Sequence, residues 1–270
     1  MSDLMSGCWA KLARAQELLD ILSSESAKYF EQFPVRIQQE FHNGGYECSL
    51  VAYGDPHPPA RIAVISGEVI HHLRSSLDHL VSALVLNNGN EVRKSNQFPI
   101  CFSKKAFEEA CSRGQLKGIT PSAKAIIESV QPYTTPTPDD TILSVVSEYD
   151  NADKHRLLVV VSALADVDGK ITIGSDPLIA AREGRVGESP EIVGFGPFGP
   201  RQLSQAGVPL FIIKLGKPAP EFTAKSSVFP QLVLQQCGRV SSAPLVSTLQ
   251  NILHGVGGTI RLFKSEFVHE

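Results

Sequence analysis

The sequence predicts an α+β fold in which a layer of helices packs on a mostly antiparallel β-sheet. Apolar residues recur at helical spacing near both ends of the chain and through much of its first half. Between these parts, apolar and polar residues alternate around turn-forming pairs, which is the pattern of strands joined by hairpins. With 270 residues, 42% of them hydrophobic, the chain can bury the core that such a fold needs.

The helical layer is expected from several segments. Glycine and proline are absent from about residue 8 to 33, so a first helix runs to near Pro34. Thr-Pro-Asp-Asp at 137–140 is a start signal, with Thr137 as the N-cap and Pro138 in the first turn. Near the end of the chain, apolar residues step by three and four positions past three glycines, which mark close packing or a kink. The expected helices cover about 8–33, 60–87, 103–114, 120–131, 137–151 and 246–267.

The sheet is expected from a hairpin near the start of the chain and from strands in its second half. Asn43-Gly44-Gly45 and Asp168-Gly169 are turn sequences that adopt positive φ easily, whereas residues 174–207 are rich in glycine and proline and predict no element. The expected strands lie within 35–54, 157–174, 208–216 and 228–236. A single domain, 1–270, is therefore predicted, with helical parts at about 1–33, 60–156 and 242–268 and β-rich parts at about 34–56 and 157–240.

Charge and cysteine content bear on the partners and the cellular location of the protein. The net charge is −3, which does not indicate a nucleic-acid partner, but residues 93–124 hold seven Lys/Arg against two Glu, a local balance of 7 − 2 = +5. This segment either favours polyanions or is a solvated surface. Five scattered cysteines without metal-ligand spacing indicate a reducing, cytoplasmic location. The longest apolar run, 157–165, is too short to span a bilayer, so no membrane association is expected.

The polar side chains of the expected helix 60–87 form one strip opposite its apolar stripe. At about 100° per residue, with Arg74 at zero, the side chains of the strip fall between about 0° and 160°. Asp78 is four residues from Arg74 and close enough to hold its guanidinium. The strip is either a reactive face or a solvent-facing one with a surface ion pair. It consists of His71, His72, Arg74, Ser75, Asp78 and His79.

Histidine and arginine on one face suit the cleavage of a phosphodiester in RNA. An imidazole that titrates near neutrality can deprotonate a 2′-hydroxyl. A fixed guanidinium can stabilise the charge that develops on the phosphorus oxygens. This chemistry requires no metal and no other cofactor.

Arg74 and His79 stand in the order Arg-x4-His, which resembles the signature of the HEPN superfamily. The resemblance implies a HEPN-like helical bundle, often a homodimer, with the activity of a metal-independent endoribonuclease. It also implies a toxin or phage-defence role, and with it an antitoxin or defence partner. Carried over, Arg74 and His79 are the catalytic pair, and we expect Asp78 to orient Arg74. The chain is also similar to a group of bacterial proteins that share the patterns H-x-LRSxLDHL and N-x-DKHR.

A second polar cluster lies where the helix that starts near 137 gives way to a strand. The end of a helix favours cations, so the cluster either complements the helix dipole or meets the Arg74 strip at a shared site. At such a site, the basic residues would contact phosphate and the Asn or Asp would orient an imidazole. The expected substrate-binding residues are His71, His72, Asn151, Asp153, Lys154, His155 and Arg156.

Three other interpretations stay open at this point. The same Arg/His pocket could belong to a non-catalytic nucleotide- or anion-binding protein, or the strip could serve only structure or protein interaction. The histidines and aspartates of the two clusters could also hold a metal, although no metal-binding motif is present. The ribonuclease hypothesis predicts that replacing Arg74 or His79 with alanine abolishes RNA cleavage and leaves thermal stability nearly unchanged.

Overall fold

The fold is α+β, as the sequence predicts. The computed structural model describes residues 4–164, 171–175, 192–195, 201–218, 222–226, 230–236, 239–240 and 243–267. The chain forms two compact units that are interleaved in sequence. A helical unit consists of Met1–Ser24, Arg61–Leu158 and Val246–Glu270, and a β-unit consists of Glu25–Ala60 and Val159–Leu245. The two units follow the predicted helical and β-rich parts, except that residues 25–33, predicted as helical, belong to the β-unit. Whether the units behave as one domain stays a prediction.

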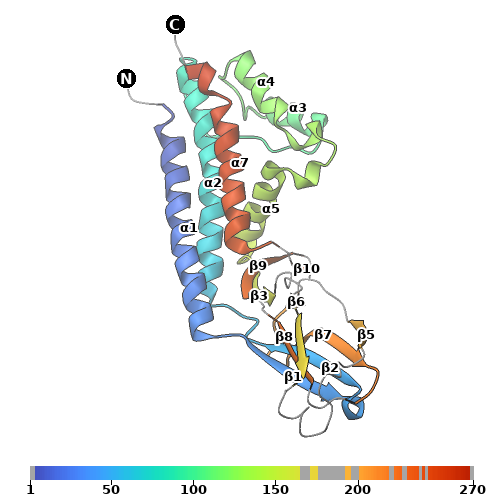
Figure 1. The fold of residues 1–270 in the computed structure, drawn as a ribbon. Coiled ribbons are helices and arrows are strands. Elements are labelled where there is room, and N and C mark those ends of the chain that lie inside the picture. The colour runs from blue at the N-terminus through green and yellow to red at the C-terminus, as the bar shows by residue number, and fades with distance from the viewer. Residues whose placement is uncertain are drawn as a thin grey trace. The chain divides into compact units, whose positions relative to one another are not determined.

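Three long helices run side by side in the helical unit: α1 (Ser6–Gln32), α2 (Ala60–Asn87) and α7 (Leu245–Arg261) (Figure 1). The apolar stripe of α2 is buried from Ile62 to Val85, as the helical spacing of its apolar residues predicts. Polar contacts also tie α7 to its neighbours. Gln16 of α1 and Gln250 of α7 exchange amide hydrogen bonds, one of them 3.0 Å long.

Three shorter helices complete the helical unit: α3 (Lys104–Ser112), α4 (Pro121–Ser129) and α5 (Ile142–His155). The hydroxyls of Ser103 and Thr120 accept the backbone N–H groups of Ala106 and Ala123, so both act as N-caps. The start signal at Thr137 is wrong in detail. Pro138–Asp140 forms only a turn of 3₁₀ helix, and α5 begins after Thr141, whose hydroxyl accepts the N–H of Ser144 at 3.2 Å.

Gly255 explains how α7 approaches α5. A Cβ at Gly255 would lie 2.7 Å from Cγ1 of Ile142 and 3.2 Å from its Cβ, so only a glycine fits there. A Cβ at Gly258 would meet no atom of the described residues within 4 Å. The expectation of close packing is therefore met at one glycine of α7, and the helix is continuous to Arg261 before a 3₁₀ turn at Lys264–Phe267.

Antiparallel sheets make up the β-unit. One sheet has the order β1-β2-β7-β5, a second has the order β10-β9-β3-β6, and β4 pairs with β8. The bounds are β1 Arg36–His42, β2 Glu47–Tyr53, β3 Val160–Leu164, β4 Ile171–Ser175, β5 Ile192–Phe195, β6 Arg201–Gln202, β7 Val208–Leu215, β8 Phe222–Ser226, β9 Pro230–Gln236 and β10 Arg239–Val240.

The predicted hairpin at 35–54 is confirmed. β1 and β2 pair from Arg36 opposite Tyr53 to His42 opposite Glu47, and Asn43, Gly44 and Gly45 all have positive φ in the connecting turn. The buried side of this hairpin packs on β7 around Leu50, Phe211 and Ile213. The turn at Asp168-Gly169 and much of 174–207 lie outside the described residues. No helix among the described residues is long and apolar enough to cross a membrane.

Candidate functional site

The polar strip of α2 contacts several neighbours and does not face solvent as a single surface. Arg74 and Asp78 turn toward the segment 96–101. Nη2 of Arg74 donates to the carbonyl of Phe98 at 2.7 Å, and Oδ1 of Asp78 accepts the N–H of Phe98 at 2.8 Å. The two side chains are themselves 3.3 Å apart. One arginine and one aspartate therefore satisfy both backbone groups of a single residue.

The segment 96–101 depends on side chains because it pairs with none of the strands that the structure describes. The Phe98 ring is fully buried, so backbone groups on either side must also leave water. Gln131, also fully buried, supplies a second clamp: its Oε1 accepts the N–H of Cys101 at 2.9 Å, and its Nε2 donates to Pro99 O at 3.0 Å. Asn96 donates to three carbonyls between 114 and 117. Arg74 and Asp78 thus belong to a network that holds this segment on α2.

Two histidines of the strip, His72 and His79, lie on the side of α1. A Cβ at Gly7 would be 2.6 Å from Nδ1 of His79, so the His79 ring rests against the start of α1. The Nδ1 atom of His72 is buried and has no hydrogen-bond partner in the described part of the chain. Burial lowers the pKa of His72, and the nearby charges of Lys11, His71 and Arg14 lower it further.

The predicted pair of Arg74 and His79 is not brought together within one chain. Five residues of helix turn the second side chain by about 140° relative to the first. Arg74 consequently faces Phe98, whereas His79 faces Gly7. His71 lies between the two directions and is exposed, with its ring 5.7 Å from that of His72.

The second predicted cluster divides in the same way. Asn151 and Lys154 do meet Arg74, because all three line one pocket. Asp153 turns toward Gly67 of α2, where a Cβ would lie 2.2 Å from its Oδ1, and burial together with Asp150 raises the pKa of Asp153. His155 and Arg156 are exposed at the end of α5 and, among the described residues, do not line this pocket. They stand where cations complement the helix dipole.

The pocket, which we call the cationic pocket, is a cavity of about 250 Å³ within the helical unit. It lies between Arg74 of α2, the segment 97–101, the end of α3 and one face of α5. The lining residues are Arg74, Gln97, Phe98, Pro99, Ile100, Cys101, Ala110, Arg113, Gln115, Ser147, Asp150, Asn151 and Lys154. Three of these side chains are cationic, one is a carboxylate, and several carry hydroxyl or amide donors.

The charges of the cationic pocket are unequally compensated. Nζ of Lys154 lies 2.5 Å from Oδ2 of Asp150, whose side chain is only 6% exposed, so this pair largely neutralises itself. Arg113 is exposed at the C-cap of α3. Arg74 is 16% exposed; its Nη2 is bonded, but its Nη1 is buried and lacks a hydrogen-bond partner among the described residues. Arg74 is itself paired with Asp78 at 3.3 Å, so it offers a free donor at Nη1, whereas the exposed Arg113 keeps its positive charge.

Other chemistry has less support in this pocket. Burial raises the pKa of Cys101, so its thiol is a poor nucleophile at neutral pH. Within the described ranges, no three His, Cys, Asp or Glu residues are placed to share a metal ion. Sequence reasoning did not single out Arg113 or Asp150. The positive balance of 93–124 includes Arg113 and was the available signal, whereas nothing in the sequence marks Asp150.

Comparison with known proteins provides no further guide to the site. The chain matches no protein-family model, no curated protein and no solved structure. The HEPN resemblance and the activity that it implies therefore stay predictions.

Proposed function

We propose that the cationic pocket binds a small oxyanion, namely phosphate or the phosphate group of a larger molecule. The unpartnered Nη1 of Arg74 is the observation that carries this proposal. A buried donor that stays unsatisfied costs about 1–3 kcal/mol, so this geometry calls for an acceptor from outside the chain. An oxyanion supplies that acceptor and a charge of the required sign.

The other lining groups support the same class of ligand. Lys154 is paired with Asp150 and Arg74 with Asp78, so the charge of Arg113 and the free Nη1 of Arg74 remain to face an anion. The planar array of donors on a guanidinium matches the oxygens of a phosphate better than a lysine does. Ser147 and the amides of Gln97 and Gln115 add neutral donors to the lining.

RNA cleavage is less well supported as the function of this pocket. It needs a proton acceptor beside the reacting phosphate, and the imidazole expected in that role, on His79, lies against Gly7 instead. The ribonuclease activity, the homodimer and the toxin or defence role stay predictions. An assay for RNA cleavage therefore belongs in the test of the pocket.

Titration with inorganic phosphate and with pyrophosphate by isothermal calorimetry tests the proposal. Arg113→Gln is the informative variant because Arg113 is exposed and its loss does not disturb the clamp on Phe98. Lys105→Gln, on the exposed side of α3, is the matched control. We expect saturable binding that weakens about tenfold in Arg113→Gln, since one charge-assisted contact contributes at least about 1.4 kcal/mol. Binding by the control should stay within about twofold of wild type, since an isolated surface charge contributes little.

Binding to wild type that is absent, or equally strong in Arg113→Gln, would overturn the proposal. Raising the salt concentration should weaken the interaction, because the exposed part of the site is screened. In parallel, incubation of wild type and His79→Gln with RNA separates the two functions. Anion binding without RNA cleavage supports a binding protein, whereas cleavage that His79→Gln abolishes supports the ribonuclease.

A further inference from the structure

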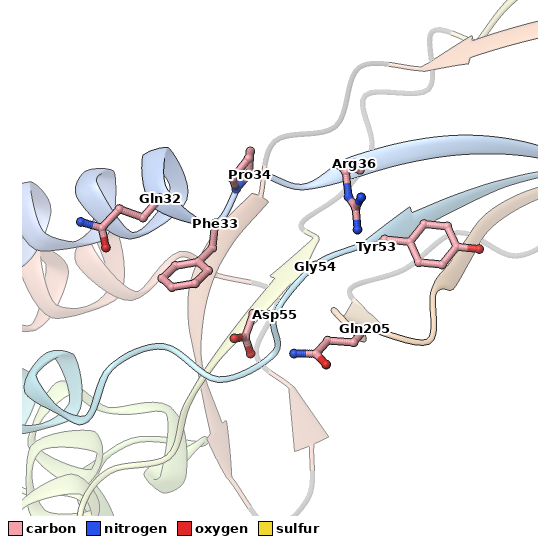
Figure 2. A pocket seen from close by; sticks show the side chains of 8 residues that line it. All are labelled: Gln32, Phe33, Pro34, Arg36, Tyr53, Gly54, Asp55 and Gln205. Carbon is pink, nitrogen blue, oxygen red and sulfur yellow. The ribbon is translucent and has the colours of Figure 1, made fainter.

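A larger cavity, of about 440 Å³, lies within the β-unit and shares no residue with the cationic pocket. It opens where the end of α1 meets the first residue of β1, the end of β2 and the loop before β7 (Figure 2). This volume falls in the range of small-molecule sites. The lining residues are Gln32, Phe33, Pro34, Arg36, Tyr53, Gly54, Asp55 and Gln205.

The walls of this β-unit cavity are held in place by its surroundings. The buried Tyr29 donates its hydroxyl proton to the carbonyl of Asp55 at 2.8 Å, and the N–H of Gly54 donates to Ser204 O at 3.2 Å. On the far side, Tyr53 donates to the carboxylate of Glu40. A cavity framed by fixed backbone needs little rearrangement to take a ligand.

Opposite charges face this cavity without neutralising each other. Arg36 makes no hydrogen bond or ion pair with any residue that the structure describes. Asp55 uses Oδ1 to accept the N–H of His57 at 2.9 Å, and its side chain has no other described partner. Figure 2 shows the Arg36 guanidinium on the β1 side of Gly54 and the Asp55 carboxylate on the other side, next to the Gln205 amide.

An aromatic surface completes the lining. Phe33 is 46% exposed, so its ring offers apolar surface to a ligand at the cavity wall. Its ring lies 5.4 Å from the ring of Tyr29 and is inclined to it by 37°, so Tyr29 fixes its position. Pro34 extends the same apolar surface.

We propose that the β-unit cavity binds a free aromatic α-amino acid. The ligand carboxylate would pair with Arg36, its ammonium group with Asp55, and its ring would pack on Phe33. Such a molecule has one acid group for Arg36, one ammonium group for Asp55 and one ring for Phe33. This inference is independent of oxyanion binding in the helical unit.

Binding of L-phenylalanine, measured by calorimetry on the full chain, tests the inference against two analogues. 3-Phenylpropionate lacks the ammonium group and 2-phenylethylamine lacks the carboxylate. We expect each analogue to bind about tenfold or more weakly than L-phenylalanine, since each loses one charge-assisted contact. Equal binding of 3-phenylpropionate would show a simple anion site at Arg36 and overturn the assignment of Asp55.

The matching variants are Arg36→Gln and Asp55→Asn. The second keeps an oxygen that can accept the His57 N–H, so the loop is preserved while its charge is removed. Each should weaken L-phenylalanine binding about tenfold or more. Lys214→Gln, exposed on β7 and outside the cavity, should not change it. No saturable binding to wild type at millimolar L-phenylalanine, or unchanged binding in both cavity variants, would overturn the inference.

Discussion

Replacing Arg74 with glutamine tests whether this arginine stabilises the fold or can be removed without structural effect. The variant loses the 2.7 Å bond from Nη2 to the Phe98 carbonyl and leaves that carbonyl without its donor. A hydrogen bond to a charged group contributes about 1.5–3 kcal/mol. The ion pair with Asp78 adds only about 0.3–0.5 kcal/mol, because the Asp78 side chain is 36% exposed and solvent screens it.

The expected loss is therefore about 2–3 kcal/mol in the free energy of unfolding. Chemical denaturation followed by circular dichroism measures it, and a lower melting temperature by roughly 4–12 °C should accompany it. His79→Gln, at the exposed ring beside Gly7, should change stability by less than about 0.5 kcal/mol. Wild-type stability in Arg74→Gln would show that the bond to the Phe98 carbonyl does not stabilise the fold, as the sequence alone predicts.

Three further predictions follow from packing and titration. Gly255→Ala should lower the free energy of unfolding by up to about 2 kcal/mol, because overpacking against the start of α5 outweighs the gain in helix propensity. Gly258→Ala should raise the free energy of unfolding by up to about 1 kcal/mol, and urea denaturation distinguishes the two signs. The lowered pKa of His72 means that the unfolded chain binds its proton first, so stability should fall as the pH drops below about 6.5. In a plot of melting temperature against pH, His72→Gln should reduce the fall below about pH 6.5, whereas His254→Gln, at an exposed site on α7, should not. Equal slopes in wild type and both variants would contradict this prediction. Gln131→Ala should lower stability by about 2–5 kcal/mol through the backbone groups left buried near Cys101, and an unchanged denaturation midpoint would exclude that second clamp.

The geometry of α2 alone predicts one contact of the candidate site and misses another. The four-residue spacing of Arg74 and Asp78 correctly places them near each other, because that contact depends only on helix geometry. The same geometry turns His79 toward a different neighbour, and only the position of α1 reveals which one. The Arg-x4-His motif is a property of one helix, whereas a reactive pair requires both groups to face the same cavity.

Local chemistry in the sequence determined the α+β class, the long helices, the hairpin at 35–54 and most helix starts, because periodicity, caps and turns act over a few residues. It placed the cap of α5 at Thr137, whereas the structure has it at Thr141, since either threonine can cap the residues that follow it. Only the tertiary structure decided that Arg74 clamps Phe98 and that Arg113 joins Lys154 around one pocket. Those contacts join residues far apart in the chain, and they stabilise the fold because they satisfy polar groups that burial removes from water.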